Sequence, residues 1–307
     1  MKRESEEKPF SLPHHLLGSG TPACAGCGAL VDIKIIYDIL GENTVFVNAA
    51  GCMTLLSVYP YTPFPGSWIY TAMASAPAGA QGVRDGLDIL LAQQRIKGGD
   101  DLQVVVLTGD GAAYGMGLSA TSGAMERDLD FIYICYDNEG YGNTGYQFSA
   151  ATPHGARTAT STGTRGYGGY KKDLFRIWQA HEPSYLATIS GAEPADLARK
   201  ITKIKDMGGP RMLIAHAPCP TGWHFDPSRT VEVGRLAVAC GAWPLKEYEQ
   251  GLLRHNKRPA PAGKRPPVEE YLRLQGRFNH LFTPRRNEEL LAEIQGRVDR
   301  YWQAVEE

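Results

Sequence analysis

Short runs of apolar residues alternate with longer amphipathic segments through the first two thirds of the chain. Val, Ile, Leu and aromatic residues dominate five runs, at 44–48, 103–108, 130–136, 184–190 and 211–217. Between these runs, residues 29–40, 80–96 and 193–205 repeat apolar side chains at helical spacing. Because buried parallel strands are apolar along their length and are connected by helices, this order predicts a doubly wound α/β domain with a mostly parallel sheet.

The character of the chain changes after residue 225. Pro227 and Pro244 interrupt the sequence, and residues 254–267 form a basic, Pro-rich stretch with little apolar content, which we interpret as an arm. Residues 268–307 regain a helical apolar pattern, which must pack on this chain or on a partner subunit. We therefore expect an α/β domain over residues 1–225, and an arm with helices for packing or subunit assembly over 226–307.

Residues 150–170 separate two of the predicted elements and are rich in Thr, Gly and Ser. They have no helical or strand periodicity. A loop of this length inside a compact domain is usually functional or mobile, so we expect one of these two roles.

Overall composition limits the classes of function. The chain has 307 residues, is 43% hydrophobic, and carries 32 Lys and Arg against 33 Asp and Glu. A net charge of −1 gives no broad attraction to nucleic acid or to anionic membranes. Residues 1–8 are charged and lack an apolar signal region, and no apolar run approaches the roughly 18 residues of a membrane span. We expect a cytoplasmic protein with neither nucleic acid nor membrane as partner.

The cysteines fall into two groups. Four of the six stand beside Gly or Pro, where a turn can direct a thiol at a shared metal site: Cys24, Cys27, Cys52 and Cys219. Cys135 and Cys240 lie within apolar runs and are typical of buried packing residues. In a reducing compartment, thiols or metal ligands are favoured over disulfides.

The spacing of the first group favours one kind of metal site. One CxxC pair with two distant cysteines is compatible with a four-cysteine iron–sulfur cluster, whereas structural zinc usually takes two close pairs. Zinc and a metal-free arrangement remain alternatives. A thioredoxin-like dithiol would use Cys24 and Cys27 and leave Cys52 and Cys219 without a role.

A second motif combines glycines with oxygen ligands at two strand ends. The apolar run at 103–108 ends in Gly109, Asp110 and Gly111, and the next run leads to Asn138 and Gly140. Glycines let the backbone approach a diphosphate, and Asp, Asn and carbonyl oxygens suit Mg²⁺. Ligands of open α/β sheets bind at such strand ends. The alternative is an ordinary polar, Gly-rich turn.

These motifs resemble those of a known family. Gly109, Asp110 and Gly111 followed by Asn138 resemble the thiamine diphosphate and magnesium signature of thiamine-dependent enzymes. Together with the four cysteines, the chain is similar to the β subunits of the 2-oxoacid:ferredoxin oxidoreductases, whose best-known member acts on pyruvate. The similarity covers nearly the whole length, including residues 24–28, 48–52, 59–62, 109–111, 141–145, 151–156, 171–174, 217–223 and 267–278.

The resemblance implies a cofactor set and the residues that bind it. It implies a 4Fe-4S cluster bound by Cys24, Cys27, Cys52 and Cys219, and Mg²⁺ bound by Asp110, Asn138 and Gly140. It implies that the thiamine diphosphate site also includes Cys52, Gly109, Gly111, Ala112, Tyr141 and Asn143. In such proteins the counterpart of Asn143 reaches the reacting end of thiamine, which makes Asn143 the candidate catalytic residue. The alternative is that Asn143 caps its own turn.

The resemblance also implies a reaction and partners. The reaction is oxidative decarboxylation of a 2-oxoacid, with electrons passed to ferredoxin and with coenzyme A as a further substrate. An α subunit would supply the Glu at the aminopyrimidine and the arginines for the substrate, and γ or δ subunits would carry ferredoxin-like clusters. A non-oxidative thiamine-dependent decarboxylase or carboligase subunit and a zinc-stabilised assembly module are the alternatives.

The sequence leaves the 2-oxoacid open. Residues 68–77 depart from the Phe-Glu-Asn-like segment of pyruvate-type members. Pyruvate is the family default, while oxalate, a branched 2-oxoacid and 2-oxoglutarate remain possible substrates.

Overall fold

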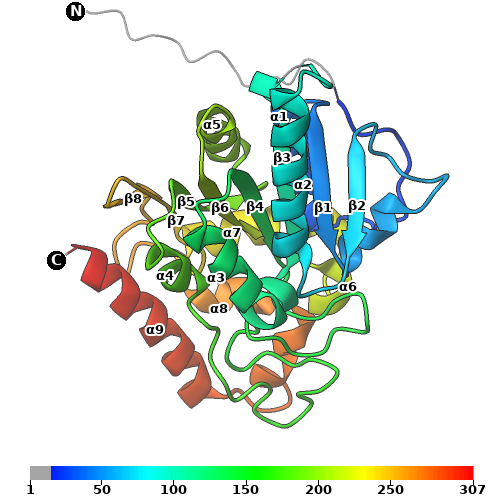
Figure 1. Cartoon of the computed structure of the whole chain (residues 1–307). Coiled ribbons are helices and arrows are strands. Elements are labelled where there is room, and N and C mark those ends of the chain that lie inside the picture. Colours follow the sequence, from blue (N-terminus) through cyan, green and yellow to red (C-terminus); the bar gives the residue numbers. More distant parts are fainter. Residues whose placement is uncertain (1–14, 98, 307) are drawn as a thin grey trace, which may run out of the picture.

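The computed structural model describes residues 15–97 and 99–306; the charged residues 1–8 lie outside this part of the chain. One eight-stranded sheet forms its centre (Figure 1). The strands are β1 (Thr44–Ala49), β2 (Ser67–Thr71), β3 (Gln103–Gly109), β4 (Phe131–Asp137), β5 (Tyr185–Ser190), β6 (Pro210–His216), β7 (Leu245–Glu249) and β8 (Leu252–Lys257).

Helices cover both faces of the sheet. The α-helices are α1 (Gly28–Leu40), α2 (Ala76–Ala92), α3 (Leu118–Glu126), α4 (Leu174–Gln179), α5 (Pro194–Lys205), α6 (Pro220–Trp223), α7 (Thr230–Ala239), α8 (Val268–Arg273) and α9 (Glu288–Glu306). A π-turn, η3 (Gly111–Met116), precedes α3. Short 3₁₀ turns are η1 (Cys52–Ser57), η2 (Gly99–Asp101), η4 (Pro227–Arg229) and η5 (Gly276–Leu281).

The strand order defines a crevice at one edge of the sheet. The order is β2-β1-β3-β4-β6-β5-β7-β8, and the first six of these strands are parallel to their neighbours. The chain leaves β1 for the edge strand β2 and then crosses back to β3 on the other side of β1. The connections therefore diverge between β1 and β3, which is where ligands bind in open α/β sheets. This architecture confirms the predicted α/β class.

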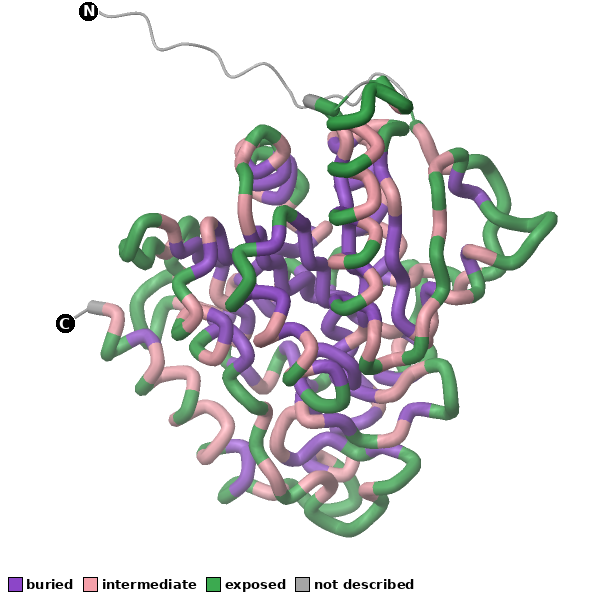
Figure 2. Tube along the Cα trace, viewed as in Figure 1, coloured by how far each residue is buried: buried purple, intermediate pink, exposed green. Residues whose placement is uncertain are grey.

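The apolar runs of the sequence become strands buried on both faces. Along β3, Val104 and Val106 face one core, while Val105 and Leu107 face the other. Successive strand residues point to opposite faces, so a run without polar residues needs helices on each side. The helices α1 and α5 cover the face that includes Val105. The remaining long helices lie on the opposite side, and burial is concentrated between these layers (Figure 2).

Five strands were predicted, and all five are present within one residue or two of the expected bounds. The sequence pattern missed β2, β7 and β8. Three of the five residues of β2 are exposed, because it is an edge strand, so it lacks a clear apolar pattern. Within β7, Lys246 and Glu247 are buried, and the carboxylate of Glu247 accepts a hydrogen bond from Tyr185 at 2.6 Å. Charged residues are usually exposed, so a sequence pattern that contains them does not predict a buried strand.

One helix prediction was displaced. The helix expected at 80–96 runs from Ala76 to Ala92, with Pro77 in its first turn, a position that proline favours. After Gly111 the chain forms η3, and α3 begins only at Leu118. The basic stretch at 254–267, predicted as an arm, begins within the exposed edge strand β8.

The C-terminal elements pack on the same core as the sheet. Val268, Leu272 and Phe278 belong to the cluster that includes Val104 and Tyr133. At the end of α9, Trp302 is 4% exposed and donates through Nε1 to the Gly241 carbonyl oxygen at 2.9 Å. The apolar stripe predicted from the sequence is therefore used, at least in part, within this chain.

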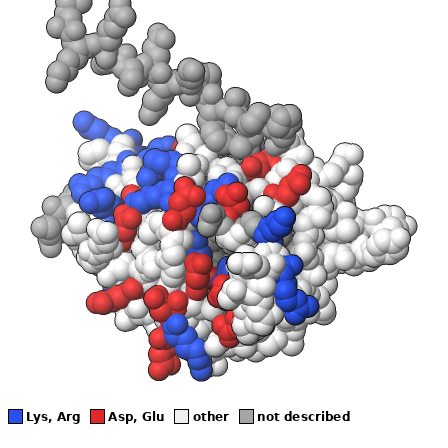
Figure 3. Space-filling model, turned by 45° about the horizontal axis from the view of Figure 1, so that its top comes forward, with Lys and Arg blue, Asp and Glu red and all other residues white. Residues whose placement is uncertain are grey.

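The apolar content of the helices and the charge on the surface can be compared with the composition of the chain. No helix among residues 15–97 and 99–306 is long and apolar enough to cross a membrane. On the face drawn in Figure 3, Lys and Arg gather toward one side, with Asp and Glu next to them, which fits a net charge of −1.

Trp302→Ala is expected to lower the free energy of unfolding by about 3–5 kcal/mol, because it removes a large buried side chain and a hydrogen bond. Chemical denaturation followed by fluorescence and circular dichroism measures this loss. The exposed neighbour Gln303 provides the control, since Gln303→Ala should change stability by less than about 0.5 kcal/mol. Equal stability of the two variants would contradict the role assigned to α9.

Candidate active site

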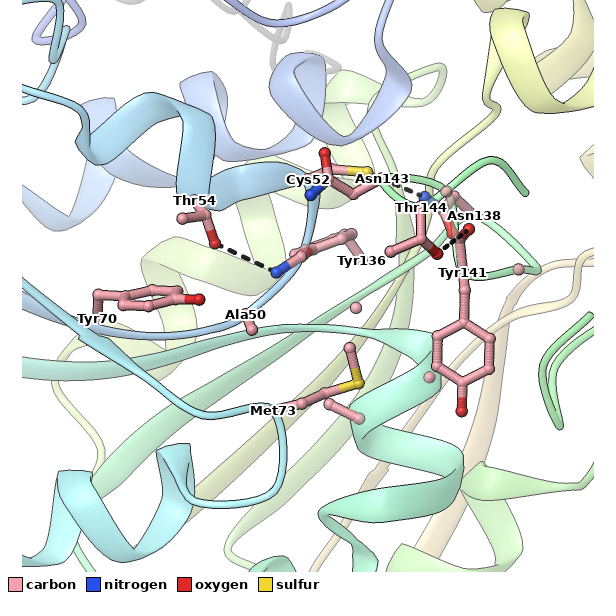
Figure 4. A pocket seen from close by; sticks show the side chains of 16 residues that line it. Ala50, Cys52, Thr54, Tyr70, Met73, Tyr136, Asn138, Tyr141, Asn143 and Thr144 are labelled. Atoms are coloured by element: carbon pink, nitrogen blue, oxygen red, sulfur yellow. Dashed lines mark hydrogen bonds between the residues drawn. The ribbon is translucent and has the colours of Figure 1, made fainter. Parts of the chain in front are cut away.

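A pocket of about 160 Å³ lies where β1, β3 and β4 end. Its wall comes from four segments: the turn after β1, the residues after β2, the Gly109–Ala112 turn and the loop from Tyr136 to Thr144. In the close view, Tyr70 and Met73 lie across the pocket from Asn138 and Tyr141 (Figure 4). The strand connections thus bring segments that are distant in sequence to one crevice.

Three oxygen-bearing groups converge beside this pocket. One of the two terminal atoms of the Asn138 side-chain amide lies 2.7 Å from Asp110 Oδ1 and 2.8 Å from the Gly140 carbonyl oxygen. If that atom is nitrogen, it donates to both acceptors; if it is oxygen, three oxygens face one another. Adjacent ligands of octahedral Mg²⁺ lie about 2.9 Å apart, given metal–oxygen distances of about 2.0–2.1 Å. The three groups predicted as magnesium ligands are therefore brought together at a suitable spacing.

Glycines are required where aromatic rings approach the turn after β3. A Cβ added to Gly111 would lie 2.2 Å from Tyr141 Cε1, which no side chain could accept. A Cβ on Gly109 would lie 3.1 Å from the Tyr136 ring. These two positions are glycine because rings occupy the space next to the backbone. Tyr141 and Ala112 both line the pocket, as predicted.

Asp110 is almost fully buried, with 1% of its surface exposed. Its Oδ2 accepts a hydrogen bond from Ser149 Oγ. Burial, and then the nearby Asp137 carboxylate, raise the pKa of Asp110 to about 8. A cation bound beside this buried carboxylate would stabilise its charged form and lower its pKa.

A buried ion-pair network lies behind this turn. Arg277 donates to Glu139 Oε2 at 2.5 Å, and Lys171 lies 3.0 Å from Glu139 Oε1 and 2.7 Å from Asp137 Oδ2. Tyr114 donates to the same Asp137 oxygen at 2.5 Å. Although burial opposes ionisation, Lys171 and Arg277 lower the pKa of Glu139 to about 2. The Glu139 carboxylate is therefore ionised at neutral pH.

The same network fixes the backbone of the Asn138 turn. Trp223 donates through Nε1 to the Asn138 carbonyl oxygen at 2.9 Å, and Tyr146 donates to it at 3.2 Å. Thr152 donates to the Glu139 carbonyl oxygen at 2.8 Å. With these acceptors satisfied, the turn presents the Asn138 side chain and the Gly140 carbonyl toward Asp110.

A second cavity, of about 760 Å³, brings the four Gly- or Pro-flanked cysteines together: its wall includes Cys24, Cys27, Cys52 and Cys219. The first pair precedes α1, the third follows β1 and the fourth precedes α6. Burial raises the pKa of Cys27 to about 11 and that of Cys52 to about 12, and the neighbouring thiols add to both increases. The geometric observation is the shared wall: all four thiols belong to residues that line this one cavity.

The thiols are not gathered about one point. Among residues 15–97 and 99–306, no three His, Cys, Asp or Glu side chains converge so as to hold a metal ion. Cys135 and Cys240 are buried in the apolar core, as their sequence context predicted.

The two cavities share part of their walls. Four residues line both of them: Cys52, Asn138, Gly142 and Asn143. Asn138 Nδ2 lies 4.0 Å from Cys52 Sγ, a contact drawn in Figure 4. Asn143, the predicted catalytic residue, is exposed at the junction.

Sequence reasoning missed the residues that position this site. Glu139, Lys171 and Arg277 had no predicted role. The signal available was a set of charged residues within segments that resemble the family, at 171–174 and 267–278. His216, at the end of β6, is 1% exposed and lies 3.3 Å from the Tyr271 hydroxyl.

Comparison with known proteins agrees with this geometry. The family "Thiamine pyrophosphate enzyme, C-terminal TPP binding domain" matches residues 49–215. Pyruvate synthase subunit PorB of Methanothermobacter thermautotrophicus is 46% identical over 287 residues, covering 92% of this chain and 94% of the relative. Ketoisovalerate oxidoreductase subunit VorB of Pyrococcus horikoshii is 39% identical, covering 91% and 90%.

A solved structure shares the fold. The 2-oxoglutarate:ferredoxin oxidoreductase from Magnetococcus marinus, with 2-oxoglutarate, coenzyme A and succinyl-CoA bound, aligns with a TM-score of 0.56 at 19% identity. The alignment covers 75% of this chain and 82% of the other. The resemblance found in the sequence is thus confirmed, and the chain belongs to the family of 2-oxoacid:ferredoxin oxidoreductase β subunits.

Proposed function

We propose that this chain is the cofactor-binding subunit of an oxidoreductase that decarboxylates a 2-oxoacid and passes the electrons to ferredoxin. It binds thiamine diphosphate with Mg²⁺ in the first cavity and a 4Fe-4S cluster in the second. The observation that carries this proposal is the shared wall of the two cavities, in which Cys52 and Asn138 line both. A non-oxidative thiamine enzyme has no need of four cysteines beside its cofactor.

The magnesium assignment rests on the donor set. Asp110, Asn138 and Gly140 offer a carboxylate, an amide oxygen and a carbonyl oxygen, which are hard ligands of the kind that Mg²⁺ prefers. Their spacing, and the burial of Asp110, fit a divalent cation. The diphosphate would lie against the Gly109–Ala112 turn, three residues of which line the first cavity.

The cluster assignment rests on the cysteines. Thiolates of Cys24, Cys27, Cys52 and Cys219 would hold the iron atoms, since four cysteines are the ligand set of a 4Fe-4S cluster. A cubane places its ligand sulfurs around a body several ångströms wide, which fits thiols that line a cavity without meeting at one point. Zinc would require all four sulfurs about 2.3 Å from a single ion.

When bound, thiamine diphosphate supplies the carbanion chemistry of decarboxylation. The residues of this chain hold and orient it. Met73 gives the pocket an apolar surface opposite Asn138, and Asn143 presents an amide that can hydrogen-bond to the substrate. Cys52 lies at the boundary of the two cavities, so it offers a short route for electrons to leave the pocket.

The pocket is incomplete in this chain. Among the described residues that line it, none is a Glu, an Asp, an Arg or a Lys. Thiamine activation needs a carboxylate at the aminopyrimidine, and a 2-oxoacid needs a cation for its carboxylate. This lack supports an α subunit that supplies both groups, with γ or δ subunits and ferredoxin as the further electron carriers.

We propose pyruvate as the substrate, with coenzyme A as the acyl acceptor. The support is the 40–46% identity to four pyruvate synthase subunits, against 38–39% to three ketoisovalerate oxidoreductase subunits; a fifth pyruvate synthase subunit is 36% identical. The assay must also include the alternative substrates oxalate, branched 2-oxoacids and 2-oxoglutarate.

The function is tested by anaerobic reduction of a viologen dye by the assembled complex, purified through a tag on this chain. Coenzyme A-dependent reduction is expected with pyruvate at a rate at least about tenfold above the other 2-oxoacids. The isolated chain should show less than about 1% of this rate, because it lacks the carboxylate that activates thiamine. Full activity of the isolated chain, or no dye reduction by the complex with any 2-oxoacid, would overturn the proposal.

Asp110→Ala is expected to weaken binding of thiamine diphosphate in the presence of Mg²⁺ by more than about 100-fold, because it removes a charged metal ligand. Calorimetric titration of the complex measures this affinity. Asp173→Ala, a change at an exposed helix cap, is the control and should leave the affinity unchanged. Similar affinities for both variants would contradict the assignment of the magnesium site.

Replacing any of Cys24, Cys27 or Cys219 by Ala should reduce cluster iron from about four atoms per chain to less than about one. Iron and acid-labile sulfide analysis, with the broad absorbance near 400 nm, gives the readout. Cys240→Ala is the matched control, since Cys240 is buried in the core. If Cys240→Ala loses as much iron as the other variants, the losses reflect misfolding and the ligand assignment fails.

A further inference from the structure

The wall between the two cavities contains a side chain that contacts both candidate sites. One end of the Asn138 amide faces Asp110 and the Gly140 carbonyl, and the other end lies 4.0 Å from Cys52 Sγ. A primary amide carries an acceptor at one end and a donor at the other. Whichever atom faces Asp110, the opposite one faces the sulfur.

The two orientations of this amide suit different states of the site. With nitrogen toward Asp110, it donates to two acceptors at 2.7 and 2.8 Å, and its oxygen faces Cys52. With oxygen toward Asp110, three oxygens converge, which a bound cation stabilises, and the N–H group faces Cys52. The first orientation is therefore favoured without a cation and the second with one.

The surroundings fix the backbone beneath this amide. The Asn138 carbonyl accepts hydrogen bonds from Trp223 and Tyr146, so a turn of the side chain need not move the backbone. Gly142 lies against the contact: a Cβ there would be 3.0 Å from Asn138 Nδ2 and 3.2 Å from Cys52 Sγ. A side chain at position 142 would therefore crowd both groups.

We propose that the Asn138 amide couples cofactor binding to the electron affinity of the cluster, by presenting its N–H group to Cys52 Sγ only when its oxygen is engaged by Mg²⁺. This inference rests on the proposed function. A donor facing a ligand sulfur stabilises the more negative, reduced cluster and raises its reduction potential. An amide oxygen facing the same sulfur does the reverse. The cluster thus accepts an electron more readily when the cofactor is in place.

Linkage makes the effect reciprocal. If cofactor binding favours cluster reduction by some factor, cluster reduction tightens cofactor binding by the same factor. The subunit would therefore hold thiamine diphosphate more firmly while an electron remains on its cluster.

The test is a redox titration of the complex, purified through a tag on this chain, with and without Mg²⁺ and thiamine diphosphate and without substrate. The electron paramagnetic resonance signal of this cluster is assigned by its loss in a Cys219→Ala complex. Adding the cofactor should favour reduction about tenfold, which is 59 mV for a one-electron couple. Asn138→Asp and Gly142→Ala, each at saturating cofactor, should lose this response while keeping iron.

Gly115→Ala is the matched control, because its Cβ would lie 3.8 Å from the Tyr141 hydroxyl, an ordinary contact. It should respond as the natural chain does. An equal response in all variants would show that the charge of the cofactor alone shifts the potential, and would overturn the inference.

A spectroscopic readout is independent of the variants. With ¹⁵N-labelled asparagine, the reduced cluster of the natural chain should show an amide nitrogen coupling that appears only after Mg²⁺ and thiamine diphosphate are added. Absence of this coupling in the loaded complex would overturn the inference. A complex without any iron–sulfur signal from this chain would instead overturn the proposed function, so the two failures are distinguishable.

Discussion

The buried ion pair between Glu139 and Arg277 is the interaction on which the site depends. Glu139 has a φ of 64°, a left-handed conformation that costs a non-glycine residue about 1–3 kcal/mol. Breaking a buried pair costs about 3–5 kcal/mol, so the pair can hold the strained turn. That turn carries Asn138 on one side and Gly140 on the other. Packing of the C-terminal segment thereby fixes the groups that face Asp110.

The sheet and this ion pair each position different residues of the crevice. Strand connections that diverge between β1 and β3 bring Cys52 and Asp110 to the same edge, whatever their side chains. The ion pairs of Glu139 with Lys171 and Arg277 then fix the turn at residues 138–140, which forms another wall of the crevice. A sheet with a charged and paired support behind its loops holds the two cavities side by side.

The sequence predicted the central strands and the family, because both depend on local patterns and motifs. Apolar runs identify strands buried on two faces, and Gly109, Asp110 and Gly111 mark a strand end. The supporting residues could not be predicted this way. Lys246 and Glu247 look like surface charges, and Arg277 has no local feature that links it to Glu139. Arg277 pairs with Glu139, which lies 138 residues earlier in the sequence. No local periodicity in the sequence reveals such a contact.

The position of Cys219 has a consequence for the order in which the protein is assembled during synthesis. Cys24 and Cys27 emerge early and Cys52 soon after, but the fourth thiol follows β6, when most of the sheet already exists. A cluster that uses all four thiols, as proposed, would therefore be completed only after β6 has been made, so its assembly would follow the synthesis of all the parallel strands.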